Sequence, residues 1–262
     1  MTSTTPTTPT TGAAFGLIFR HYLRRLGSGI FGPLIFVVLP VLITTVLSFI
    51  YTRNAGEEIY VFGYNMVSTH IARGMMILFQ LNSGIYLLNY LNYDFFHPMG
   101  WRLKAAPCRT YVLVLAAITS CMVFTVLQGV FIITATAFLI DVYWGSLWVA
   151  VLVVVLLSLI SQFLNMLLFF LIRNAGTVEG LSWLISLAMA VLSGVYFPLP
   201  DNTFFRFIQR YGTPFALAQT SIKEAGFLRT SAGQVGVCLT ALLAHTLILM
   251  FAVIALARRE WR

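Results

Sequence analysis

A series of long, uncharged apolar stretches dominates the chain. The third of them, residues 111–140, continues for thirty residues without a charged side chain. The hydrocarbon core of a bilayer is about 30 Å thick and requires about 20 apolar residues in a helix. The sequence therefore predicts an all-α integral membrane protein with six transmembrane helices. The predicted spans are residues 29–51, 74–93, 111–140, 147–172, 178–197 and 235–257.

The low content of charged residues supports an integral membrane protein. Only 9% of the 262 residues are charged and 59% are hydrophobic, whereas soluble domains carry about 25% charged residues. This composition excludes a free cytosolic enzyme and a nucleic-acid binder, although the net charge is +8. If the N-terminus is cytoplasmic, ten Lys and Arg residues fall in inner segments and five in outer ones. The positive-inside rule therefore predicts that both termini are cytoplasmic.

The N-terminal region divides into two parts. Residues 1–12 are rich in Thr and Pro and predict a disordered tail. We expect the remaining residues, 13–262, to form a single transmembrane domain. Within residues 14–28, apolar side chains recur at helical spacing opposite Arg20, Arg24 and Arg25. This pattern favours an amphipathic helix at the cytoplasmic membrane interface. A plain extension of the first span is the alternative.

Three connecting segments are unusual. Residues 94–107 form a cytoplasmic loop rich in aromatic and basic residues, which fits either a belt at the head-group level or a docking surface. Residues 198–234 lie outside and predict short re-entrant helices that either cap a pathway or anchor the loop. In the turn at residues 173–176, Asn174 or Gly176 is expected to take the left-handed conformation that ends a helix.

No catalytic constellation is present in the sequence. It contains no phosphate-binding Gly-x-x-x-x-Gly-Lys-Ser/Thr loop, no His-Glu-x-x-His and no Gly-x-Ser-x-Gly. Its three cysteines and four histidines are scattered, so they predict neither a disulfide framework nor a metal site. We therefore expect that the chain is not an enzyme and holds no cofactor.

Few titratable residues fall within the predicted spans. His245 is the only deep one, and a lone buried histidine more often packs through a hydrogen bond than relays protons. His70 and Arg73 lie at the outer end of the second span, where we expect snorkelling. Neutral polar residues instead mark several helix faces and either pack helices together or line a pathway. The candidates for pathway lining are Asn82, Tyr86, Asn89, Ser182, Ser186 and Ser193.

The order of these parts resembles the membrane subunit of ABC type-2 exporters. Residues 102–107 (RLKAAP) are similar to an Arg-Leu-x-x-x-Pro element at the end of that family's cytoplasmic coupling helix. Residues 193–199 (SGVYFPL) resemble its Ser-Gly-x-x-Phe-Pro-Leu element at the outer end of span five, and residues 213–218 (TPFALA) resemble the segment after it. The resemblance covers nearly everything after the Thr/Pro tail.

This resemblance implies a permease subunit in the plasma membrane that pairs with a second permease chain and with separate ABC ATPase subunits. ATP and Mg²⁺ would then bind to the partner ATPase, not to this chain. The resemblance assigns an outer gate to Phe197, Pro198 and Pro214. It assigns coupling to the ATPase to Asp94, Gly100, Trp101, Arg102, Leu103 and Pro107.

Three alternatives to an ATP-driven exporter stay open, of which an ion channel is the least favoured, because the sequence shows no ring-forming charged or Gly-rich filter segment. A secondary, ion-coupled transporter would need His245 or Glu179 as a proton site. A membrane regulator that is coupled to ATP but transports nothing would have the same sequence features. Neither the substrate nor the choice between homodimer and heterodimer follows from the sequence.

Overall fold

The computed structural model describes residues 11–28, 31–54, 60–61, 64–96, 110–196, 199–227 and 232–260. Within these residues, six segments are long and apolar enough to cross a membrane, which confirms the predicted all-α membrane fold. The helices that contain them are α2 (Phe31–Asn54), α3 (Met66–Asn82) with α4 (Ile85–Leu91), α6 (Thr110–Ile140), α7 (Leu147–Ile172), α8 (Ala175–Leu192) and α11 (Ala232–Glu260).

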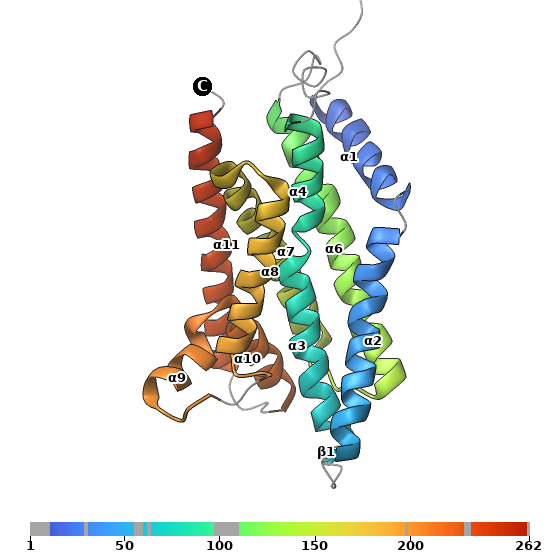
Figure 1. Cartoon of the computed structure of the whole chain (residues 1–262), viewed down its shortest axis with the longest axis vertical. Helices are drawn as coiled ribbons and strands as arrows, with labels where there is room; N and C mark the ends of the chain where they lie inside the picture. Colours follow the sequence, from blue (N-terminus) through green and yellow to red (C-terminus); the bar gives the residue numbers. More distant parts are fainter. Residues whose placement is uncertain are drawn as a thin grey trace, which may run out of the picture.

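The bundle has two distinct ends (Figure 1). Helix α1 (Thr11–Ser28) and the C-terminal end of α11 lie at one end, which we call the α1 end. Helices α9 (Thr203–Phe207) and α10 (Pro214–Phe227) lie at the opposite end, the α10 end. That end also carries two short antiparallel strands, β1 (Tyr60–Val61) and β2 (Tyr64–Asn65), which the sequence did not predict.

Helix α1 is attached to the bundle along one face. It begins at Thr11, so two residues that we expected in the tail are helical, and residues 1–10 lie outside the described residues. Tyr22 and Leu26 on its apolar face are buried, and the helix packs along α6. The Ser120 hydroxyl of α6 also donates a hydrogen bond to the Phe19 carbonyl, at 3.2 Å. The predicted amphipathic pattern therefore serves contact with α6.

The second span is the core of the bundle. From Ser68 to Asn82, every residue of α3 except His70 is buried. Helices α2, α6, α7, α8 and α10 pack around it. Spans at the periphery instead expose large apolar side chains, such as Phe49 of α2 and Phe251 of α11, which are 65% and 63% exposed. In a membrane these exposed faces would contact lipid.

The second span also begins earlier than predicted, at Met66 instead of residue 74. Asn65 caps its first turn, because its side-chain oxygen accepts hydrogen bonds from the backbone N–H groups of Val67 and Ser68, at 3.0 and 3.1 Å. Arg73 does not snorkel: it is 3% exposed and donates to the Tyr143 carbonyl at 2.9 Å. The segment between α6 and α7 thus supplies an internal acceptor for the guanidinium.

The turn between α7 and α8 corrects a second expectation. Arg173, and neither Asn174 nor Gly176, takes the left-handed conformation, with φ of 56°. Asn174 is extended and caps α8, because its side-chain oxygen accepts a hydrogen bond from the Thr177 N–H at 3.1 Å. An N-cap residue must be non-helical, so the left-handed position falls one residue earlier.

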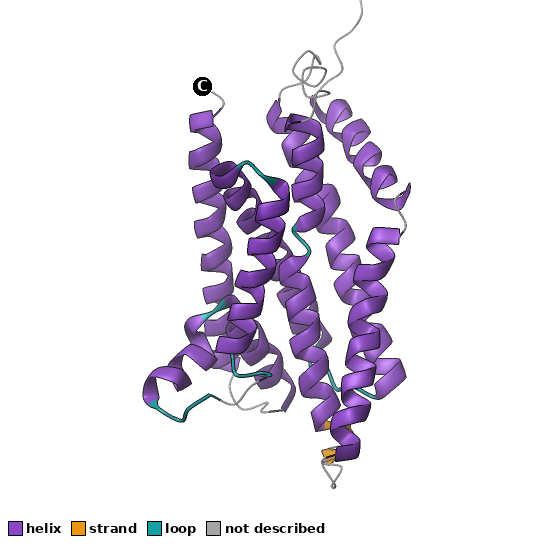
Figure 2. Cartoon of the chain, viewed as in Figure 1, coloured by secondary structure: helices purple, strands orange, loops and turns teal. Residues whose placement is uncertain are grey.

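A break at Ser83 and Gly84 divides the second span into α3 and α4, visible as the loop within this span in Figure 2. The hydroxyl of Ser161 on α7 spans the break. It accepts a hydrogen bond from the Gly84 N–H at 2.7 Å and donates one to the Leu81 carbonyl. A Cβ atom at Gly84 would overlap the backbone carbonyl of Ser161. Gly84 therefore permits the close approach of the second span to α7.

We expect that Gly84→Ala lowers the free energy of unfolding by about 1–3 kcal/mol, because the added methyl group forces two backbones apart. The matched control is Gly180→Ala in α8, where an added Cβ meets nothing within 4 Å. Thermal unfolding of both variants in the same detergent measures the difference. Equal melting temperatures for the two variants would contradict this account of the break.

Candidate coupling site and transport pathway

A charged cluster joins α1 to the end of the second span. Asp94 lies in η1 (Asn92–Phe96), the π-helical turn that continues α4. Its carboxylate accepts hydrogen bonds from the Tyr22 hydroxyl at 2.6 Å and from the Arg25 guanidinium at 2.8 Å. The side chains of Arg25 and Asp94 are 29% and 11% exposed. This ion pair is therefore largely shielded from solvent, and we call Tyr22, Arg25 and Asp94 the α1 joint.

Aromatic rings complete the α1 joint. The Arg25 guanidinium carbon lies 4.8 Å from the ring centroid of Tyr90 and 4.6 Å from that of Tyr93, a geometry that favours cation–π attraction. Burial raises the pKa of the Tyr22 phenol, and its hydrogen bond to Asp94 raises this pKa further. Tyr22 therefore stays protonated and keeps donating to Asp94, so α1 and η1 are held as one unit.

Asp94 is the only predicted coupling residue within the described part of the chain. The others, Gly100, Trp101, Arg102, Leu103 and Pro107, lie outside the described residues. Their role in coupling stays a prediction.

A second group of polar side chains lies around the break in the second span. Gln80 donates to the Thr125 carbonyl at 3.1 Å and to the Ser158 hydroxyl. The Asn165 amide donates to the Ser161 carbonyl at 2.9 Å and to the Ser182 hydroxyl at 3.1 Å. These bonds connect α3, α6, α7 and α8, and hydrogen bonds of this kind hold helices together in membranes.

Several acceptors in this polar group lack a hydrogen bond. No group among the described residues forms a hydrogen bond with Gln80 Oε1, Asn82 Oδ1, Asn165 Oδ1 or the Tyr86 hydroxyl. A buried unsatisfied polar atom costs about 1–3 kcal/mol. The arrangement is therefore suited to accept hydrogen bonds from water or a polar solute when the neighbouring helices separate.

The predicted pathway residues do not share one surface. Asn82, Ser182 and Ser186 are buried to 1% exposure or less, and Ser193 is 9% exposed and donates to the Ala190 carbonyl at 2.6 Å. Asn89, by contrast, is exposed. The prediction of a polar helix face assumed that the second span is one continuous helix, whereas this span is broken before Tyr86. The assignment of these residues to pathway lining stays a prediction.

The titratable residues that a proton-coupled mechanism would use are separate from this polar group. His245 Nδ1 lies 2.8 Å from the Ala241 carbonyl in its own helix, as expected for a packing residue. Glu179 is exposed near the start of α8.

Residues 194–196, which precede the predicted outer gate, pack against α3. Gly194 has φ of +70°, and a Cβ atom on Gly74 would lie 2.6 Å from Val195 Cγ1 and 3.2 Å from the Tyr196 hydroxyl. Phe197 and Pro198 lie outside the described residues. The chain therefore leaves α8 in close contact with the second span.

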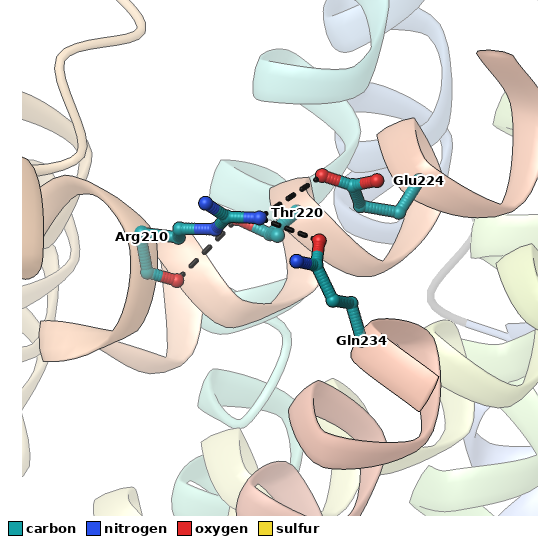
Figure 3. A network of polar contacts seen from close by, with 4 residues as sticks. All are labelled: Arg210, Thr220, Glu224 and Gln234. Carbon is teal, nitrogen blue, oxygen red and sulfur yellow. Dashed lines mark hydrogen bonds and ion pairs between the residues drawn. The ribbon is translucent and has the colours of Figure 1, made fainter. Parts of the chain in front are cut away.

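Helix α10 continues the predicted gate segment. Pro214, its first residue, is buried, and the Thr213 hydroxyl caps the helix by accepting the Ala216 N–H at 3.1 Å. The helix packs against α7 and α11. Figure 3 shows how Arg210 of η2 (Ile208–Gly212) contacts α10 and α11, through Glu224 at 3.4 Å and through Gln234. The gate assignment stays a prediction.

Comparison with known protein families decides the class of the chain. Residues 13–224 match the family model described as ABC-2 type transporter. The chain belongs to this family. It is a multi-pass membrane protein and a permease component of an ABC-type transporter. No curated protein matches it.

Sequence reasoning about the permease missed the partners of Asp94. Tyr22 and Arg25 precede Asp94 by 72 and 69 residues, so no local pattern connects them. One signal was available: a carboxylate at the end of an apolar span needs a cation or several donors. The amphipathic segment at residues 14–28 offered such cations, Arg20, Arg24 and Arg25, at the predicted inner interface.

We expect that Asp94→Asn lowers the free energy of unfolding of the permease by about 1–3 kcal/mol, because it leaves Arg25 opposite a neutral group. Tyr22→Phe should cost about 1 kcal/mol, the value of one hydrogen bond. The control is Asp201→Asn, which breaks an exposed pair with Arg206 and should leave stability unchanged. Denaturation in detergent tests all three, and an effect of Asp201→Asn as large as that of Asp94→Asn would refute the assignment.

Proposed function

We propose that the chain is the permease subunit of an ATP-driven exporter, and that two permease chains work with two separate ABC ATPase subunits in the plasma membrane. The match of residues 13–224 to the ABC-2 type transporter family carries this proposal. The sequence supports a separate ATPase, because it lacks a phosphate-binding loop. ATP and Mg²⁺ would bind to that subunit, and both termini of the permease would be cytoplasmic.

In this proposal the force from the ATPase enters the permease beside the α1 joint. The predicted coupling residues at 100–107 follow Asp94 closely in the chain. Asp94 is bonded to Tyr22 and Arg25 of α1, and α1 packs along α6. A push on the coupling segment would therefore move the second span and α1 together.

The break at Ser83 and Gly84 would allow the two halves of the second span to change their relative direction. Such a change alters the surroundings of the unsatisfied acceptors on Asn82 and Asn165. We therefore retain as pathway residues those assigned from the sequence: Asn82, Tyr86, Asn89, Ser182, Ser186 and Ser193. Phe197, Pro198 and Pro214 would form the gate at the α10 end.

Purification of the tagged permease in a mild detergent tests the proposed partner. We expect an ATPase with a phosphate-binding loop to co-purify. Arg102→Glu should abolish co-purification by reversing a charge in the coupling segment, whereas Arg258→Glu near the end of α11 should retain it. Purification of the permease without any ATPase would contradict the proposal.

Transport assays in vesicles separate the remaining functional classes. For an exporter, substrate stimulates ATP hydrolysis, and accumulation continues when an uncoupler removes the proton gradient at constant ATP. Loss of accumulation under these conditions would instead indicate a secondary transporter. A complex that hydrolyses ATP without moving any solute would indicate a membrane regulator.

A further inference from the structure

Two cavities adjoin at the α10 end of the permease. One has a volume of about 530 Å³ and lies between α3, η2 and α10. The other, of about 340 Å³, lies between α2, α3 and the segment after α8. His70 and Val195 line both cavities, and His70 Nε2 lies 3.2 Å from the Val195 carbonyl oxygen at their border. Each volume falls within the usual range for small-molecule sites.

The larger cavity is polar and basic. Its lining includes Arg206, Arg210 and Lys223, and Glu224 is the only acidic residue among the described residues that line it. Glu224 already pairs with Arg210 at 3.4 Å (Figure 3), and Arg206 pairs with Asp201 at 3.0 Å in an exposed position. Lys223 is exposed, and within the described residues no carboxylate forms an ion pair with it. This excess of cations favours an anionic group in the cavity.

The same cavity contains an unsatisfied acceptor. Gln219 is 8% exposed and lines the cavity. Its Nε2 lies 3.4 Å from His70 Nδ1, whereas its Oε1 has no hydrogen-bond partner among the described residues. A buried acceptor of this kind costs about 1–3 kcal/mol when left unpaired. Neighbouring atoms cover this oxygen, so a ligand hydroxyl would supply the missing donor once the Gln219 amide turns toward the cavity.

The smaller cavity is apolar. Leu47 of α2, Val67 and Ile71 of α3, and Tyr196 line it. None of the described residues that line it is Asp, Glu, Lys or Arg, and His70 lies at its border with the larger cavity. Hydrocarbon gains about 0.8 kcal/mol for each methylene group removed from water, so this cavity is suited to an alkyl chain.

We propose that the two cavities form one binding site for an anionic amphiphile whose head group carries hydroxyls. The anion would lie near Lys223 and Arg210, a head-group hydroxyl would donate to Gln219, and one alkyl chain would enter the cavity beside Val67 and Ile71. Phospholipids with a glycerol head group have this chemistry. The site requires neither ATP nor a second chain, so this proposal is independent of the exporter function.

Titration of the purified full-length permease with dioctanoylphosphatidylglycerol tests the site, with binding followed by microscale thermophoresis. We expect saturable binding that is weaker for the zwitterionic dioctanoylphosphatidylcholine and for inorganic phosphate. Dioctanoylphosphatidylmethanol keeps the charge but lacks the head-group hydroxyls. The wild type should therefore bind dioctanoylphosphatidylmethanol more weakly than dioctanoylphosphatidylglycerol. Gln219→Leu should bind the two lipids equally.

Two variants separate the polar and apolar cavities. Lys223→Gln should weaken dioctanoylphosphatidylglycerol about fivefold, the effect of roughly one cation near an anionic lipid. Val67→Trp fills the apolar cavity and should weaken it about tenfold, as when roughly two methylene groups are no longer buried. The matched controls are Arg53→Gln at the end of α2 and Val237→Trp on the exposed face of α11. Neither control residue lines the cavities, and both variants should bind normally.

Three results would overturn the proposal. The first is equal binding of the glycerol and choline lipids, which would exclude selection of an anion. The second is binding of inorganic phosphate as tight as that of the lipid, with no effect of Val67→Trp, which would exclude the apolar part. The third is equal weakening in the variants and in their controls, which would exclude these cavities as the site.

Discussion

The interior of the permease depends on how the backbone N–H and C=O groups are hydrogen-bonded where the second span breaks. In lipid, a free N–H or C=O group has no water to bond, and each costs several kcal/mol. The Ser161 hydroxyl pairs with one N–H group and one C=O group at the break, because a hydroxyl can accept and donate a hydrogen bond at the same time. It accepts from Gly84 and donates to Leu81. One side chain on α7 thereby permits a broken helix at the centre of the bundle, where α3 and α4 contact α6, α7 and α8.

In the α1 joint, shielded charged groups are likewise paired with partners from another element. Arg25 is held by the Asp94 carboxylate and by two tyrosine rings, and Asp94 accepts a further hydrogen bond from Tyr22. Separation of α1 from η1 would leave an ion without its partner in a partly buried place, which is strongly unfavourable. The two elements are therefore expected to move as a unit, even though α1 lies outside the six spans.

Features that depend on length and local apolarity could be predicted from the sequence, whereas features that depend on distant partners could not. The six spans and the helix before the first one follow from runs of apolar residues. The early start at Met66 did not follow, because Arg73 is made tolerable by a carbonyl 70 residues away. The break at Gly84 likewise depends on Ser161, 77 residues later. The motif at residues 102–107 predicted a coupling segment, but it did not predict the contacts of Asp94 with α1.

The second span links the two ends of the molecule. Asp94 lies at its α1 end, and His70 lies near its start, where it lines both cavities. Between them, Gly74 holds α3 against Val195, which lines the same cavities from the other side. A displacement of α3 would therefore change the shape of the ligand site. Because binding linkage is reciprocal, an amphiphile that prefers one position of α3 would bias the α1 joint to the same degree as the joint biases its binding.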